Sequence, residues 1–198
     1  MSVDLPAVAN APRTMRRIPG VEGIWVFVGV DMLFFALLFG LFMTQRMRAP
    51  AIFESARRTL DADFGGINTL VLLTSSWFVV LAVDAAKRDR LADVPRWLMA
   101  AFACGLLFAV SKAFEYGAKI AAGISPTTND FYMYYYVLTG FHLLHVVAGS
   151  VMLLVFWNLA RRRRFGSSRM AVLECGATFW HMVDLLWIVL FPLLYLLR

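Results

Sequence analysis

Five long apolar segments dominate the sequence, and each is long enough to cross a lipid bilayer as a helix. A helical span takes about 20 predominantly apolar residues, so these segments leave little sequence for a separate soluble domain. The chain is 61% hydrophobic and 16% charged, whereas soluble domains carry fewer apolar and more charged residues. We therefore predict an all-α integral membrane protein, a bundle of five transmembrane helices. The predicted spans cover residues 21–44, 67–86, 97–118, 131–159 and 171–197.

The spans predict a single transmembrane domain over residues 21–198, preceded by a polar tail over residues 1–20. The first span is not typical of a cleaved signal peptide, because it is too long and carries Asp31 in its middle. The connection over 45–66 contains Pro50 and a pair of glycines, and we expect a short surface helix there.

The basic residues predict the orientation of the chain in the membrane. Twelve of them fall on the side that holds the N-terminus and six on the other, so the positive-inside rule places the N-terminus in the cytoplasm and the C-terminus in the periplasm. We interpret the arginine run at 161–164 as a topology anchor at anionic lipid headgroups, and we expect no nucleic acid partner. The aromatic cluster over 131–136 is typical of an outer interfacial belt.

Ionisable side chains inside the spans are the candidate functional residues, because embedding them is costly and often marks function. On a helical wheel, the fourth and fifth spans each have one polar stripe. The stripes consist of Tyr135, Thr139, His142, His145 and Gly149 on the fourth span and of Glu174, Ala177, His181, Asp184 and Tyr195 on the fifth. We expect the two stripes to face each other, with imidazoles and carboxylates as mutual partners, so that a polar group of the third or fifth span lies near His142 or His145. The candidate interhelical network is Lys112, Glu115, His142, His145, Glu174, His181 and Asp184.

The third span combines a polar pair with a ladder of small residues. Lys112 and Glu115 are three residues apart, a spacing at which side chains on a helix interact. Small residues at every fourth position let helices approach closely, and we expect these positions to form helix contacts. They are Ala101, Gly105, Ala109, Ala113 and Gly117, with Gly149 on the fourth span.

Two interpretations of the embedded histidines and carboxylates compete. They can be hydrogen-bonding contacts between helices, or they can bind haem or iron. His142 and His145 are three apart on one helix and cannot be trans axial ligands of one haem, which favours helix contacts. Asp31 stands alone in its span, so it is expected to be protonated or bonded to another helix; proton handling and simple packing both remain open.

Several segments resemble motifs of the cytochrome c oxidase subunit III family. They appear in the family's order, from about residue 22 to residue 197. Asp31 falls where the family has a membrane-buried glutamate. The segments are VDMLFF at 30–35, INTLVLLTSSW at 67–77, FEYGAKI at 114–120, YVLTGFHLLHVVAGSVMLL at 136–154 and ATFWHMVDLLWIVLFPLLYL at 177–196.

The resemblance implies a non-catalytic accessory subunit in a bacterial cytoplasmic membrane. Such a subunit carries no cofactor or metal of its own, packs against a catalytic chain, and supports that chain's assembly, stability and proton uptake. Haem with copper or non-haem iron is then expected in the partner subunits, and bound phospholipid in this one. By position, Asp31 matches the family's buried carboxylate near the proton-entry side.

The number of spans is where the chain departs from the family's full form, which has seven helices. Five-helix forms resemble the subunit-III-like protein of bacterial nitric oxide reductase as well as shortened oxidase subunits, and the missing helices favour the nitric oxide reductase branch. A small proton or solute transporter and a b-type haem-binding, quinol-oxidising subunit are the alternatives.

Overall fold

The computed structural model describes residues 22–162 and 167–197, and within these ranges every regular element is helical. Five helices are long and apolar enough to cross a membrane, which confirms the predicted fold class. The predicted polar tail over 1–20 lies outside the described residues. In chain order the elements are α1 (Glu22–Arg48), α2 (Pro50–Arg57), α3 (Ala62–Lys87), α4 (Val94–Ala121), α5 (Asp130–Arg161), α6 (Ser167–Phe191) and the π-helix η1 (Pro192–Leu196).

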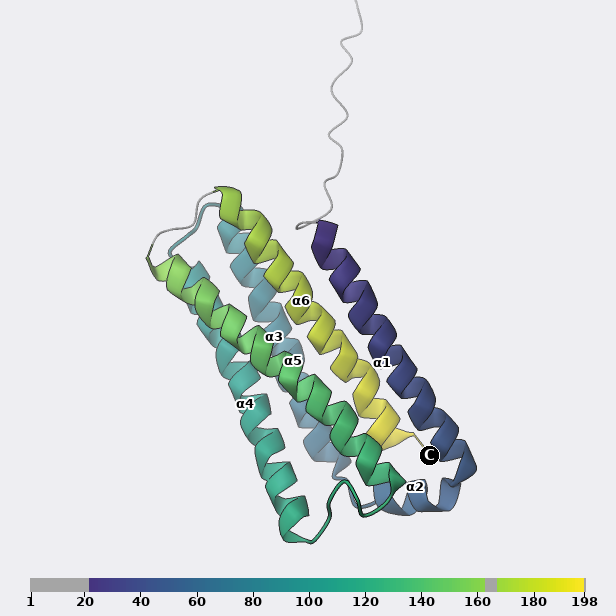
Figure 1. The fold of residues 1–198 in the computed structure, drawn as a ribbon. Helices are drawn as coiled ribbons and strands as arrows, with labels where there is room; N and C mark the ends of the chain where they lie inside the picture. Colours follow the sequence, from purple (N-terminus) through teal and green to yellow (C-terminus); the bar gives the residue numbers. More distant parts are fainter. Residues whose placement is uncertain (1–21, 163–166, 198) are drawn as a thin grey trace, which may run out of the picture.

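The long helices alternate in direction and lie side by side (Figure 1). At one end or both, each long helix extends past its predicted span, because hydrogen bonding continues into polar residues that an apolar pattern does not count. At the starts of α3 and α5, the side chains of Asp61 and Asn129 accept backbone N–H groups as N-caps. The expected surface helix in the 45–66 connection is present as α2, across one end of the bundle.

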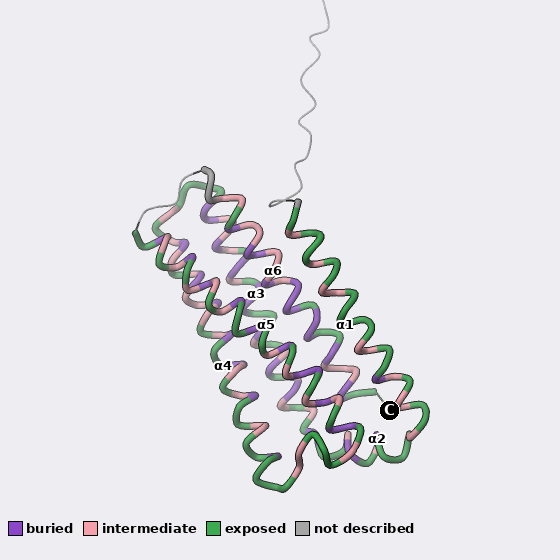
Figure 2. The backbone as a smooth tube through the Cα atoms, in the orientation of Figure 1, coloured by how far each residue is buried: buried purple, intermediate pink, exposed green. Residues whose placement is uncertain are grey.

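Helices α3 to α6 form the core, and α1 lies at its edge against α5 and α6. In its most apolar stretch, α1 has 11% of its residues buried, whereas α6 has 50%. Figure 2 shows the same contrast, with α1 drawn mostly as exposed and the buried positions gathered where the other helices meet. The outward faces of all five helices are rich in exposed apolar side chains.

The small-residue ladder of α4 packs only along its first part. Ala101 and Gly105 are buried, Ala109 is partly buried, and Ala113 and Gly117 are exposed. The expectation that all five form helix contacts is therefore wrong. A step of four residues turns a helix by one full turn plus about 40°, so four steps rotate the ladder by about 160°, away from its neighbours.

Gly105 and Gly149 make room for one large side chain. A Cβ atom on either residue would lie within 2.8 Å of the Trp180 ring, and Trp180 is 1% exposed. The expected packing role of Gly149 and Gly105 is thus confirmed. Their partner is an indole from α6 that inserts between α4 and α5.

Three aromatic residues at the start of α5 are buried inside the protein. Phe131, Tyr132 and Tyr135 are at most 4% exposed. Phe131 packs edge-on against Phe53 of α2, with ring centroids 5.6 Å apart. The belt prediction is therefore wrong for these three residues, because α2 and the end of α6 cover them, a contact between distant segments that the local sequence does not reveal. Tyr134 and Tyr136 are partly exposed.

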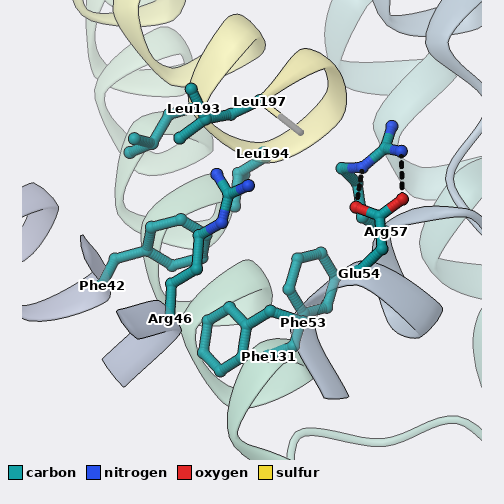
Figure 3. A pocket seen from close by; sticks show the side chains of 9 residues that line it. All are labelled: Phe42, Arg46, Phe53, Glu54, Arg57, Phe131, Leu193, Leu194 and Leu197. Carbon is teal, nitrogen blue, oxygen red and sulfur yellow. Dashed lines mark hydrogen bonds and ion pairs between the residues drawn. The ribbon is translucent and has the colours of Figure 1, made fainter. Parts of the chain in front are cut away.

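An arginine on α2 links this helix to the end of the last one. Figure 3 shows its guanidinium group paired with the Glu54 carboxylate. Arg57 donates two hydrogen bonds to the Glu54 carboxylate, at 2.9 and 3.0 Å. Its remaining nitrogen donates to the backbone oxygen of Tyr195 at 3.1 Å. Arg58 also donates to Glu54, at 3.0 Å. Glu54 therefore orients the arginine that links α2 to η1.

The pairing of Arg57 with Glu54 makes part of the stability depend on pH. Hydrogen bonds from Arg57, then from Arg58, lower the pKa of Glu54 from 4.5 to about 2. A lowered folded-state pKa stabilises the fold above pH 4.5, and this stabilisation is lost as the pH falls toward 2. Thermal unfolding of Glu54→Gln in detergent should therefore give a lower Tm than the wild type at pH 6 and the same Tm near pH 2. A Tm difference that persists at pH 2 would contradict this account.

Candidate functional site

The most deeply buried charged group is Lys112 on α4, whose side chain is 0% exposed. Its Nζ donates to Glu115 Oε2 at 2.6 Å and to the Tyr195 hydroxyl at 2.7 Å. The hydroxyls of Tyr135 and Tyr195 donate to Glu115 Oε1 at 2.6 and 2.8 Å. The predicted pairing of Lys112 with Glu115 is confirmed. We call these four residues the Lys112 centre.

The Lys112 centre satisfies the conditions under which a buried ion pair is tolerated. Both carboxylate oxygens of Glu115 accept hydrogen bonds, and the ammonium also lies 4.8 Å from the centre of the Trp187 ring, within the range of a cation–π interaction. A buried pair repays its desolvation only when its remaining hydrogen-bonding capacity is filled in this way. The centre joins α4, α5, α6 and η1.

Proline explains how Tyr195 reaches the centre. Pro192 has no N–H to donate back along α6, so the helix widens into a π-turn, closed by a 2.9 Å bond from Leu197 N to Pro192 O. Tyr135 and Tyr195 both lie on the predicted polar stripes but were not among the candidate residues. Their positions on the polar stripes were the sequence signal by which these two tyrosines could have been recognised as candidates.

Asp31 of α1 forms a pair with His145 of α5, with 3.1 Å between Oδ1 and Nε2. The other ring nitrogen, Nδ1, lies 2.7 Å from the backbone oxygen of Phe141. A carbonyl only accepts, so Nδ1 carries a hydrogen. The Nε2–Oδ1 contact then requires one further proton, held either by the carboxyl or by the imidazole. Asp31 and His145 are therefore a pair that shares one proton.

The predicted partner of the fourth-span histidines is wrong. His145 bonds to α1, and neither ring nitrogen of His142 has a hydrogen-bond partner in the described part of the chain. His142 is 0% exposed, and its ring lies between Phe108 and Trp187, with centroids 5.5 and 5.0 Å away. Its contacts with α4 and α6 are aromatic, not polar.

The polar stripe of α6 faces α3 instead of α5. His181 Nδ1 bonds to Ser76, Glu174 pairs with Lys87 at 2.8 Å, and Trp187 donates to Thr69 at 3.0 Å. The predicted face-to-face arrangement of imidazoles and carboxylates between the last two spans is therefore wrong, because α6 packs its polar side chains against the hydroxyl-bearing face of α3.

Asp184 is buried on the same helix, and its Oδ1 has no partner within the described residues. Near the same helices, His181, Glu174, Lys87 and Asp84 line an open cavity of about 380 Å³. Across the described residues, no three His, Cys, Asp or Glu side chains are grouped so that they could hold a metal ion. The candidate network thus divides into separate clusters at different helix contacts.

Comparison of the sequence with known proteins identifies the family of this chain. The family model described as cytochrome c oxidase subunit III matches residues 14–197. The chain belongs to this family. A cytochrome c oxidase subunit 3 from Synechocystis is 31% identical over 176 residues, which make up 88% of this chain and 74% of that relative. A probable cytochrome c oxidase subunit 3 from Mycobacterium bovis is 29% identical over 89% of this chain and 87% of the relative.

Among these subunit III relatives, the short form is not unusual. The relative from Thermostichus vulcanus, 31% identical over 178 residues, matches 87% of its own length and 89% of this chain. The two chains are therefore of similar length. The resemblance stated from the sequence motifs is confirmed by the family match, and the five-helix architecture is compatible with proteins named as oxidase subunits.

Proposed function

We propose that this chain is an accessory subunit of a haem-copper terminal oxidase in a bacterial cytoplasmic membrane, without an active site of its own. Membership of the subunit III family over nearly the whole chain is the observation that carries the proposal. Oxygen reduction would take place at haem and copper centres in a partner chain. The role of this subunit would be to support assembly, stability and proton uptake of that partner, in contact with membrane lipids.

The Asp31–His145 pair supports the proton-uptake part of the proposal. A carboxyl and an imidazole that share one proton 3.1 Å apart can hold and release it with little movement. Both side chains are only partly buried, at 13% and 16% exposed. The pair lies between α1, at the edge of the bundle, and α5, where a partner chain or lipid is within reach.

A nitric oxide reductase remains the second candidate partner, in which non-haem iron would accompany haem. The five predicted spans, compared with seven in the family's full form, favoured this partner in the sequence. Relatives of similar length are named as oxidase subunits, so chain length no longer separates the two partners. We place the oxidase first for that reason.

Co-purification tests the proposal. The full-length chain is tagged, expressed together with the other subunits of its complex, and extracted from the membrane in a mild detergent. It should co-purify with a haem-bearing chain in a fixed ratio. Haem absorption should be present only in preparations that contain the partner chain, and absent when the subunit described here is purified alone. Haem bound stoichiometrically to the isolated chain would overturn the accessory role and favour a b-type cytochrome.

The transporter alternative has a separate readout. The purified chain in liposomes, under an imposed proton gradient, should show no more proton flux than empty vesicles. Flux that disappears in Asp31→Asn would support a transporter and contradict the accessory role.

A further inference from the structure

Lys119, in the last turn of α4, is a second buried lysine, and it has no hydrogen-bonding partner in the described part of the chain. The residue is 8% exposed. Its ammonium lies 5.9 and 5.6 Å from the ring centres of Tyr132 and Tyr135, near the outer limit of cation–π attraction. An ammonium has three N–H donors, and ring faces at this distance do not satisfy them.

The nearest carboxylate on the same helix is already occupied. Glu115, one turn before Lys119, receives hydrogen bonds from Lys112, Tyr135 and Tyr195. Its charge is balanced by Lys112 at 2.6 Å. Two buried lysines thus share one carboxylate, and the positive charge of Lys119 is left over. A buried charge of this kind is costly unless something pairs with it.

Lys119 lines an open cavity of about 300 Å³ between the start of α3 and the end of α4. Gly123, at φ +75°, ends α4 in a Schellman motif, with bonds from Gly123 N to Ile120 O and from Ile124 N to Lys119 O. This turn places Ile124 in the cavity wall. The full lining is Thr59, Asp61, Phe64, Glu115, Ala118, Lys119, Ala122 and Ile124.

The lining leaves two charged groups for a ligand. Thr59 is engaged with the Tyr132 hydroxyl and the Ala56 carbonyl. Asp61 uses Oδ1 to cap α3, but it is exposed, and no ion pair with Lys119 forms within the described residues. A ligand that meets both groups therefore carries a negative charge for Lys119 and a positive one for Asp61.

The position of the cavity indicates a lipid. Lys119 lies near the end of the span α4, and Asp61 lies directly before the start of the span α3. Lipid headgroups lie at the same depth in a membrane as these helix ends. On α4, the face that carries Ala118 continues into the bilayer region with exposed apolar side chains at spacings of three and four. These are Phe114, Val110 and Leu107, which are 73%, 41% and 56% exposed.

We propose that this cavity binds the phosphoethanolamine headgroup of a phospholipid, with the phosphate on Lys119, the primary ammonium on Asp61, and the acyl chains along α4. A quaternary choline ammonium has no N–H to donate to Asp61, and a glycerol headgroup has no cation. An acidic side chain of a partner protein fits less well, because Asp61 would repel it. The site deepens the lipid contact proposed above and rests on it.

Native mass spectrometry of the delipidated full-length chain tests the site. Phosphatidylethanolamine, phosphatidylcholine and phosphatidylglycerol with identical acyl chains are added separately, and the Kd of the first bound lipid is measured. Phosphatidylethanolamine should bind about tenfold more tightly than either of the others. Lys119→Met should weaken this binding at least tenfold, whereas Lys119→Arg should retain it. Asp61→Asn, which keeps the N-cap acceptor, should bind phosphatidylethanolamine and phosphatidylcholine equally.

Each other outcome overturns the assignment. Equal binding of the three lipids to the wild type, or equal binding by wild type and Lys119→Met, excludes this headgroup site. Tighter binding of phosphatidylglycerol excludes the role of Asp61. Loss of the haem-bearing partner from Lys119→Met preparations with unchanged lipid binding would assign the cavity to an acidic group of that partner. Circular dichroism melting of each variant monitors folding, and co-purification of the wild type tests the accessory role independently.

Discussion

Replacing Glu115 with glutamine is expected to lower the free energy of unfolding by about 3 kcal/mol, because it leaves the Lys112 ammonium buried without an opposite charge. The Lys112 side chain is 0% exposed, so solvent does not compensate its charge when the carboxylate is lost. The measurement is equilibrium unfolding of the full-length chain in mixed micelles, followed by circular dichroism. The double variant Lys112→Met/Glu115→Gln should be less destabilised than Glu115→Gln alone, since it removes the orphaned charge.

Lys87→Met is the matched control for this experiment. It breaks the Lys87–Glu174 pair, which has a similar 2.8 Å separation, but Lys87 is 51% exposed. Exposed ion pairs contribute at most about 1 kcal/mol, so this variant should be nearly as stable as the wild type. Equal losses in Glu115→Gln and Lys87→Met, or a double variant at least as unstable as Glu115→Gln, would contradict the role given to the Lys112 centre.

Adding a single methyl group at Gly149 is expected to cost about 2 kcal/mol, the usual scale of overpacking a well-filled core. A Cβ atom there would lie 2.6 Å from Trp180 Cε3, and the indole is too deeply buried to move aside. Equilibrium unfolding of Gly149→Ala in mixed micelles measures this loss of stability. In the double variant Gly149→Ala/Trp180→Phe, the loss should be smaller than the sum of the two single losses, because the smaller ring admits the methyl group.

Gly140→Ala supplies the control on the same helix. A Cβ atom at Gly140 would have no neighbour within 4 Å, and alanine is the better helix former by about 1 kcal/mol. This variant should be at least as stable as the wild type. If Gly149→Ala behaves like Gly140→Ala, then Gly149 is not needed to make room for the Trp180 ring.

The sequence predicted the number and type of the helices because apolar length is a local property. It also predicted the Lys112–Glu115 pair, since both partners lie on one helix at a known spacing. Contacts between helices were predicted less well. A polar stripe indicates which side of a helix is buried but not which neighbour covers it. His145 and Glu174 were therefore each assigned to the wrong neighbouring helix.

Three other features were not predicted from the sequence. The four-residue spacing of the small residues on α4 suggests that they share one face of the helix. Because each step of four residues exceeds a full turn, Gly117 lies away from the contact that Gly105 makes. The route of Tyr195 into the Lys112 centre depends on the π-turn after Pro192, whose width an ideal wheel does not represent. Lys119 lies at the end of a predicted span, where a lysine is ordinarily solvated, so nothing marked it as buried.

The edge position of α1 has a consequence for biogenesis. This helix is synthesised before the other four spans that the structure describes, and the helices it packs against, α5 and α6, are the last of these. During translation α1 therefore remains in the bilayer without its final neighbours, and Asp31 without His145, until most of the chain has been inserted. The docking of α1 is a late step of assembly, and a chaperone or partner subunit that shields Asp31 has that interval in which to act.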